Sequence, residues 1–209
     1  MSNFVITIAR GYGSGGRTVG KMLAERLNIS YHDKDLINLA SEESGIHVSL
    51  FGKVDEQPPS RIFRKKNIYR GELFHPESDE FVSEDNLFNY QAKIIKDIAS
   101  NSSCVIVGRC ADYILKDYPN LIRLFIYADL ETCIKNVVDM YSISPEEARK
   151  RIKKIDKERS SYYRYHTGHD WNNAYNYDLC LNTSRMDFET CVEIILSYIR
   201  IKLGNINAG

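Results

Sequence analysis

The residues from Gly11 to Thr18, GYGSGGRT, form the first stretch of the sequence whose types and spacing could do chemistry. Glycines at 11, 13 and 16 fit G-x-G-x-x-G, the pattern of dinucleotide-binding loops. The same stretch fits G-x-x-x-x-G-K-[ST], the pattern of triphosphate-binding loops, except that Arg17 stands where lysine is usual. Both patterns place phosphate against backbone N–H groups at a helix N-terminus. The sequence therefore predicts a phosphate site and leaves the class of enzyme to other features.

The flanking sequence favours the triphosphate-binding loop. Asp33 does stand at about the distance where a dinucleotide site holds the ribose with an acidic residue. However, the strand before Asp33 is weak, and no third strand follows before Cys104. In a triphosphate loop, Arg17 would reach the β- or γ-phosphate and the Thr18 hydroxyl would bind Mg²⁺. The predicted phosphate-binding residues are Gly11, Gly13, Ser14, Gly15, Gly16, Arg17 and Thr18.

Short apolar runs alternate with helical patterns, which is typical of an α/β fold with a parallel sheet. Strands are expected at 4–9, 29–33, 104–108, 121–128 and 177–183. Helices are expected from Gly16 onward and at 33–45, 84–100, 129–141, 144–166 and 187–199, the fifth of these opening on a Ser144-x-x-Glu147 capping box. The segment 46–83 shows little periodicity, so we expect an irregular excursion or small lobe there. Because ligands bind at the carboxyl ends of parallel strands, the glycine loop and Arg109 should meet at one edge.

Length and composition indicate a single globular domain. The chain has 209 residues, 43% of them hydrophobic and 27% charged, and its formal net charge is zero. A neutral chain gives no general reason to expect nucleic acid or a membrane as a partner. No apolar run is long enough for a membrane span, and the N-terminus lacks the features of a signal peptide. The five cysteines show no C-x-x-C pattern, so we expect reduced, mostly buried thiols and a cytoplasmic protein.

Several segments together resemble the cytidylate kinase-like family of P-loop kinases. They are GSGGRTVGKMLAERLNISYHDKDLI, IVGRCADYIL, RLFIYADLETCIKNV, IDKERSSYYRYHTGHDW and YDLCLNTS. The resemblance implies transfer of the ATP γ-phosphoryl group to a nucleoside monophosphate, with CMP or dCMP as the expected acceptor and Mg²⁺ as the cofactor. It also implies a core at 1–45, 84–143 and 170–209, an acceptor-binding insertion at about 46–83 and a helical lid at about 144–169.

The resemblance also assigns roles to individual residues. Arg109 matches an arginine that contacts the acceptor phosphate, and Asp33 would accept a hydrogen bond from the acceptor, although it could equally cap the helix that follows. The basic run after 144 would be the lid, with Arg151, Lys154 and Arg159 roughly along one side, although a solvated helix face is the usual meaning of such a run. Asp156 and Arg159 match the D-x-x-R of the lid. The predicted catalytic residues are Arg17, Arg109, Asp156 and Arg159.

Metal binding and the acceptor are less defined by the sequence. Arg109, rather than an aspartate, follows the apolar run CVIVG, so Mg²⁺ would be held by Thr18, the phosphates and water. Two alternatives stay open: a kinase of another small metabolite on the same fold, and a nucleotide-binding regulatory protein with little turnover. Small-molecule nucleotides are the expected partners in the leading interpretation, and the sequence leaves the oligomeric state undetermined.

Overall fold

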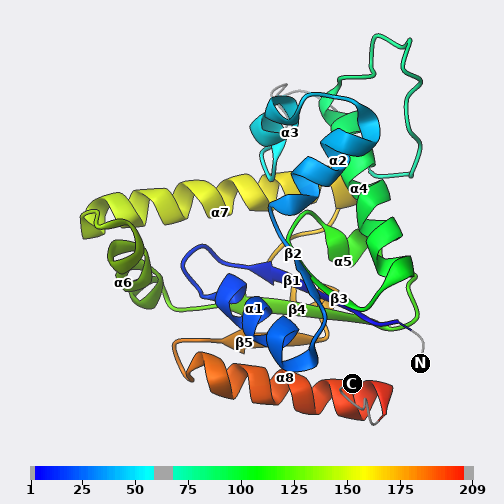
Figure 1. Ribbon diagram of the computed structural model, residues 1–209. Helices are drawn as coiled ribbons and strands as arrows, with labels where there is room; N and C mark the ends of the chain where they lie inside the picture. Colours follow the sequence, from blue (N-terminus) through cyan, green and yellow to red (C-terminus); the bar gives the residue numbers. More distant parts are fainter. Residues whose placement is uncertain (1–2, 59–67, 205–209) are drawn as a thin grey trace.

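The computed structural model describes residues 3–58 and 68–204 and contains one sheet of five parallel strands (Figure 1). The strands are β1 Val5–Arg10, β2 Ser30–His32, β3 Cys104–Val107, β4 Leu121–Tyr127 and β5 Leu179–Asn182, in the spatial order β2-β3-β1-β4-β5. β1 lies in the centre, with Thr7 in register with Ile106 of β3 and with Arg123 of β4. The predicted α/β fold with a parallel sheet is confirmed.

The strand order also separates the two glycine-loop patterns. A dinucleotide-binding domain places β2 next to β1. Here β3 lies next to β1 and β2 lies at the edge of the sheet. The chain between β2 and β3 runs from His32 to Cys104, and its described residues form α2 (Asp35–Ser44), α3 (Val48–Val54) and α4 (Glu84–Asn101) before it returns to the sheet. The dinucleotide-binding alternative is therefore wrong.

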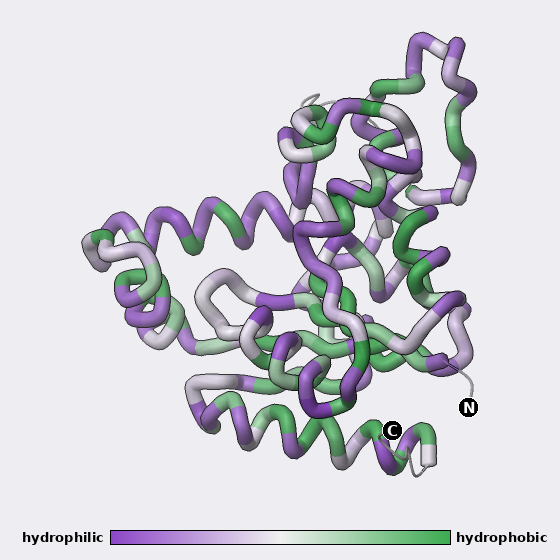
Figure 2. Tube along the Cα trace, viewed as in Figure 1, coloured by the Kyte–Doolittle hydropathy of each residue, from purple (hydrophilic) through white to green (hydrophobic). Residues whose placement is uncertain are grey.

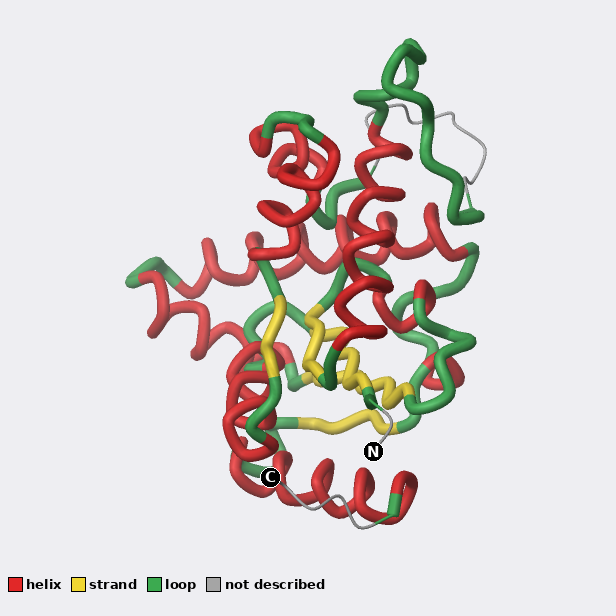
Figure 3. The backbone as a smooth tube through the Cα atoms, turned by 45° about the vertical axis from the view of Figure 1, so that its right-hand side comes forward, coloured by secondary structure: helices red, strands yellow, loops and turns green. Residues whose placement is uncertain are grey.

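The sheet has a separate apolar layer on each face, because alternate residues of a strand point in opposite directions. Ile6 and Ile8 join a cluster with α1 (Gly16–Leu27) and α8 (Phe188–Leu203). Val5 lies on the other face with α2 (Asp35–Ser44), α3 (Val48–Val54), α4 (Glu84–Asn101) and the short α5 (Ala111–Ile114). Figures 1 and 3 show the sheet between these two sets of helices, so the fold has three layers.

The chain between β2 and β3 differs from what the sequence predicts in two respects. The segment 46–83 is not wholly irregular, since α3 lies within it and buries Phe51. The helix expected from Asp33 begins at Asp35, and no side chain caps its N-terminus. The alternative that Asp33 caps this helix is therefore wrong. Residues 61–70, RIFRKKNIYR, form a basic run in the sequence that could cradle an acceptor phosphate or be a solvated loop, and most of it lies outside the described residues.

A long helix, α7 (Pro145–Thr167), crosses the molecule beside α6 (Leu130–Tyr141) and is hydrophilic over much of its length (Figure 2). It starts with the predicted capping box. The Ser144 side chain accepts a hydrogen bond from Glu147 N–H, and the Glu147 carboxylate accepts one from Ser144 N–H. Ala148 and Ile152 pack against α6, whereas Tyr162 and Tyr163 pack into the cluster around α4. The helix is thus anchored at both ends.

The cysteines and the lengths of the helices were also predicted from the sequence. All five thiols are free, and Cys104, Cys110, Cys133 and Cys191 are buried while Cys180 is exposed. Within the described ranges, no helix has both the length and the hydropathy needed to cross a bilayer. A short 3₁₀ turn at Ala174–Asn176 leads into β5.

Candidate functional site

The glycine loop joins β1 to α1 at the carboxyl edge of the sheet. Hydrogen bonds to β4 and within the loop fix its shape. Gly11 N–H donates to the Ile126 carbonyl at 3.0 Å, and Ser14 Oγ donates to the Gly11 and Ile126 carbonyls at 2.9 and 3.0 Å. The first helical hydrogen bond runs from Val19 N–H to the Gly15 carbonyl. The N–H groups at 16–18 therefore precede the ladder of α1, where backbone donors lack helical partners and the helix dipole favours an anion.

Two of the loop glycines are required by geometry. Gly13 has φ of 83°, and a Cβ there would lie 2.8 Å from the Cys133 carbonyl oxygen. Gly15 has φ of 81°, and its Cβ would lie 2.3 Å from the ring of Phe188. Any side chain at these positions would be strained and would clash. The loop therefore presents its backbone, rather than side chains, to whatever binds above it.

A cavity of about 430 Å³ lies over the loop and reaches α6 and α7. The Tyr12 and Tyr141 rings stack at 6.5 Å between centroids, and the Arg151 guanidinium lies 4.0 Å from the Tyr141 ring centroid. The cavity is lined by Arg10, Gly11, Tyr12, Gly13, Gly15, Gly16, Arg17, Thr18, Asn136, Val137, Asp139, Met140, Tyr141, Arg159 and Phe188. All seven predicted phosphate-binding residues except the buried Ser14 line it. We call it the loop pocket.

The Arg17 side chain forms an ion pair with Asp33. Its Nε lies 2.7 Å from Asp33 Oδ2, and its side chain is 42% exposed. Asp33 also accepts from Arg109 through Oδ1 at 3.1 Å. One carboxylate thus holds two of the predicted site arginines, and the predicted contact between Arg17 and a phosphate would require this ion pair to loosen.

Arg109 is a buried residue held by acids. Its side chain is 1% exposed, and its NH2 donates to Asp55 Oδ2 at 2.9 Å. Burial opposes its charge, but Asp55, Glu56 and Asp33 outweigh that effect and raise its pKa above the usual arginine value. Arg109 has φ of 54°, an uncommon conformation for a non-glycine residue that tends to occur at functional sites.

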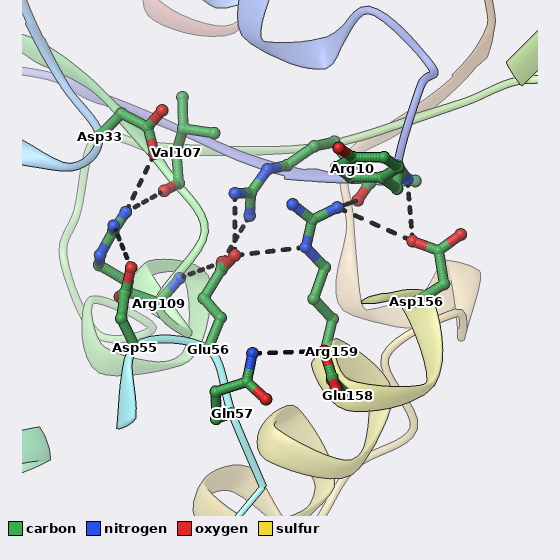
Figure 4. A network of polar contacts seen from close by, with 12 residues as sticks. Arg10, Asp33, Asp55, Glu56, Gln57, Val107, Arg109, Asp156, Glu158 and Arg159 are labelled. Atoms are coloured by element: carbon green, nitrogen blue, oxygen red, sulfur yellow. Dashed lines mark hydrogen bonds and ion pairs between the residues drawn. The ribbon is translucent and has the colours of Figure 1, made fainter. Parts of the chain in front are cut away.

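Glu56 lies at the centre of the buried charges (Figure 4). Its carboxylate accepts two hydrogen bonds from Arg10, at 2.5 and 2.9 Å, and one from Arg159 Nε at 3.2 Å. Burial alone would raise the pKa of Glu56, but Arg10 and Arg159 outweigh it and hold the pKa well below its usual range. We call Arg10, Arg109, Arg159 and the acids bound to them the guanidinium cluster.

Asp156 and Arg159 connect α7 to the loop. Asp156 Oδ1 accepts from the backbone N–H of Tyr12 at 2.8 Å, and Arg159 NH1 donates to the Arg10 carbonyl at 3.1 Å. Burial, followed by the nearby charge of Arg10, lowers the pKa of Arg159 to about 10. Asp156 therefore positions the helix against the loop, while Arg159 brings a desolvated positive charge beside it.

The three predicted lid residues do not share one surface. Arg151 and Arg159 each place their guanidinium carbon 5.7 Å from the centroid of the Tyr12 ring. Lys154 is 75% exposed, lies 3.9 Å from Glu158 and lines a different cavity. The expectation that Lys154 follows the same side of the helix as the two arginines is wrong.

That second cavity, of about 470 Å³, lies between α3, α4 and α7. Its aromatic side includes Phe88 stacked on His166 at 3.7 Å between centroids, and Tyr162 edge-on to both rings. Gln91 also lines it, and the buried Gln91 Oε1 has no hydrogen-bond partner among the described residues. Aromatic rings beside a buried amide suit a planar, polar ligand group. We call this cavity the insertion pocket.

Thr18 is the side chain that the sequence predicts as a ligand of Mg²⁺. Thr18 is exposed in the first turn of α1, so its hydroxyl is accessible from the loop pocket. The described residues contain no group of three or more His, Cys, Asp or Glu side chains that could hold a metal ion. A single hydroxyl completed by phosphate oxygens and water fits Mg²⁺, which keeps several waters when bound.

Sequence reasoning missed three residues of the guanidinium cluster. Arg10 ends β1 just as Arg109 follows β3, so its position at the carboxyl edge of the sheet was a usable signal. Asp55 and Glu56 follow α3 in the segment interpreted as irregular. Nothing local indicates that these two acids return to the sheet edge.

A profile of the cytidylate kinase-like family matches residues 5–185. The chain belongs to this family. The predicted resemblance is confirmed, and the match covers the loop, the guanidinium cluster and α7.

Individual proteins support the same grouping. A cytidylate kinase of Methanococcoides burtonii is 27% identical over 88% of this chain and 89% of its own. An uncharacterized protein from Eubacterium ventriosum has a crystal structure with 29% identity and a TM-score of 0.70, covering 94% of this chain and 98% of that one. A shikimate kinase from Bacteroides thetaiotaomicron is 14% identical with a TM-score of 0.54, covering 94% of this chain and 98% of its own, which supports the P-loop kinase fold alone. Family and fold together support a phosphotransferase.

Proposed function

We propose that this cytidylate kinase-like protein transfers the γ-phosphoryl group of ATP to a nucleoside monophosphate, with CMP or dCMP as the first acceptor to test. The observation that carries the proposal is the position of the guanidinium cluster. Arg159 lines the loop pocket and also binds Glu56, which is directly followed by Gln57 of the insertion pocket. The buried arginines thus stand between a phosphate-binding loop and a second cavity.

The loop pocket would hold ATP. Backbone N–H groups at 16–18 and the dipole of α1 attract the phosphates, and the glycines let the polyphosphate approach closely. Thr18 would hold Mg²⁺, which when bound neutralises charge on the β- and γ-phosphates. The stacked Tyr12 and Tyr141 rings offer a flat surface for the nucleobase.

The insertion pocket would hold the acceptor. In the transfer, an oxygen of the acceptor phosphate forms a bond to the γ-phosphorus while the bond from that phosphorus to the β–γ bridging oxygen breaks, leaving ADP. Charge on the transferring group is stabilised by positioned cations. Arg159 is the proposed cation, because it lines the loop pocket and binds Glu56 beside the insertion pocket. Arg109 and Asp33 are proposed acceptor contacts, and Asp156 positions α7 over the loop.

An acceptor panel tests this proposal directly. ADP formation is measured with Mg²⁺ and ATP against the common nucleoside monophosphates, their deoxy forms and phosphate-free hydroxy acids and sugars. We expect turnover with a pyrimidine monophosphate, CMP or dCMP above the others. Turnover only with a phosphate-free metabolite would establish the small-metabolite alternative. ATP binding without turnover on any acceptor would establish the regulatory alternative.

A further inference from the structure

Glu56 receives more hydrogen bonds than an ordinary surface carboxylate. Arg10 binds both of its oxygens through NH1 and NH2, at 2.5 and 2.9 Å. Arg159 Nε adds a bond at 3.2 Å to Oε2, and the backbone N–H of Arg109 adds one at 3.2 Å to Oε1. Two guanidinium groups and a backbone donor arranged around one anion resemble the surroundings that proteins build for phosphate.

The guanidinium cluster retains two buried donors that have no acceptor in the described part of the chain, one on Arg10 and one on Arg109. The Nε atoms of Arg10 and Arg109 are buried and have no hydrogen-bond partner among the described residues. The Arg10 side chain is 4% exposed, so bulk water has little access to its Nε donor. Buried donors without partners are unfavourable, and a larger anion with more acceptor oxygens could satisfy them.

The backbone around Glu56 is strained in the conformation that places it here. Glu56 has φ of 54°, in the left-handed region that L residues seldom adopt. Gly108, at φ of 80°, leaves the necessary space, since a Cβ there would lie 2.0 Å from Glu56 Oε1 and 2.2 Å from Arg10 NH1. Releasing Glu56 would relieve part of this strain.

Glu56 also stands on the route between the two pockets. Its partner Arg159 lines the loop pocket, and its neighbour Gln57 lines the insertion pocket and donates to Glu158 at 3.3 Å. An acceptor in the insertion pocket would have to direct its phosphate toward this position to reach ATP over the loop.

We infer that Glu56 is a displaceable internal anion: its carboxylate holds the position of the acceptor phosphate, and Arg10 is a binding residue of that phosphate subsite. The inference rests on the proposed function for the identity of the ligand, a phosphate monoester. A phosphate dianion brings more charge and more acceptor oxygens than the carboxylate it replaces. Glu56 keeps the buried arginines neutralised until the acceptor arrives, at the cost of weaker acceptor binding.

Titration with inorganic phosphate tests the inference without ATP or acceptor. Phosphate affinity is measured by calorimetry for the wild type, Glu56→Gln and Glu56→Gln combined with Arg159→Ala. We expect Glu56→Gln to bind phosphate about tenfold more tightly, because the competing charge is gone, and Arg159→Ala to reverse the gain. Glu146→Gln, which removes an equal charge at an exposed site on α7, is the control and should leave the affinity unchanged. Affinity in Glu56→Gln that is equal to or below that of the wild type would overturn the inference.

A second measurement uses the wild type, in case Glu56→Gln does not fold. Hydrogen exchange in a peptide covering 53–57 should become faster when phosphate saturates the protein, since Glu56 leaves its partners. Unchanged or slower exchange would show that Glu56 keeps its structural contacts when phosphate binds.

Because neither measurement involves turnover, a displaced Glu56 in a protein inactive on every acceptor would reject the proposed function alone. Turnover with Glu56 fixed in place would reject this inference alone.

Discussion

The glycine loop begins directly after Arg10, which belongs to the guanidinium cluster, and the two regions present their hydrogen-bond donors by different means. The loop uses backbone N–H groups whose directions are set by β1 and α1, with hydrogen bonds to Ile126 behind them. The cluster uses long side chains that start from β1, the end of β3 and α7. Backbone donors need no counter-ion to stay in place, whereas buried guanidinium groups need paired acids to offset their desolvation.

This difference suggests how each half behaves on binding. The loop is held in one shape by its own contacts, since Gly13 and Gly15 have φ of 83° and 81° and hydrogen bonds to Ile126 fix its position. The cluster has an internal set of ion pairs that must be exchanged for pairs with ligand. Binding at the loop should therefore change the structure little, and binding at the cluster should rearrange the residues around Glu56.

The largest effect should come from removing a cluster cation while leaving the loop intact. Arg159→Ala should lower turnover by about 10²–10³-fold, the scale of one lost transition-state contact. ATP affinity should change much less, because the loop backbone supplies most of that binding. Steady-state kinetics and calorimetry with ATP separate the two quantities. Lys150→Ala, on the exposed side of the same helix, is the control. A variant that raised only the Michaelis constant for ATP would place Arg159 with the loop.

A substitution of Arg17 tests whether this residue acts with the glycine loop or forms only an ion pair with Asp33. Arg17→Ala should lower turnover by about 10²-fold if its guanidinium leaves Asp33 for a phosphate. Arg17→Lys should keep part of the activity, since lysine is the usual residue in this loop pattern. Steady-state kinetics of the wild type, Arg17→Ala and Arg17→Lys measure these effects. Normal ATP binding and turnover in Arg17→Ala would assign Arg17 to a structural ion pair with Asp33.

Gly108 allows the cluster to be disturbed through the backbone. Gly108→Ala would insert a Cβ against Glu56 and Arg10, in a conformation unfavourable for alanine. We expect a loss of about 1–3 kcal/mol in the free energy of unfolding, the usual cost of overpacking. Denaturant unfolding measures it. The same change at Gly52 in α3, where a Cβ would meet nothing within 4 Å, should be neutral or slightly stabilising. Equal stability of both variants would mean that the cluster relaxes easily.

The smallest effect concerns the aromatic side of the insertion pocket. Burial lowers the pKa of His166 to about 3, so the folded protein holds this imidazole neutral. Between that value and the ordinary value of 6.5, the unfolded chain binds the extra proton, and stability falls as pH falls. Between pH 7 and pH 5.5, we expect His166 to lower the free energy of unfolding by about 1 kcal/mol. Unfolding curves of His166→Phe should lack this component, whereas exposed His75→Gln should retain it. An unchanged pH profile in His166→Phe would contradict the assignment.

The sequence predicted the parts of the fold whose signals are local. The eight residues of the loop carry their own pattern, and Val19 and Leu23 report the buried face of α1 by their spacing. Ser144 and Glu147 mark the start of α7 within one turn. Each of these features depends on residues a few positions apart, so the sequence alone displays it.

The guanidinium cluster could not be predicted in the same way. Its members are brought together by the return of the insertion to the sheet edge, and the pairing of Arg10 with Glu56 spans 46 positions. Asp33 was expected to contact the acceptor or to cap the helix that follows, and the capping alternative failed because Arg17 and Arg109 hold the carboxylate. Ion pairs between distant segments leave no periodic signal.

The hydrogen bond from Tyr12 N–H to Asp156 bears on how this protein could diverge. Its donor is the backbone, so only proline at position 12 would remove it. The side chain at position 12 takes no part in this bond, and its ring is one wall of the loop pocket beside Tyr141. Under the proposed function, a change at residue 12 would alter which nucleobase the loop pocket binds, while the bond to Asp156 would still attach α7 to the loop.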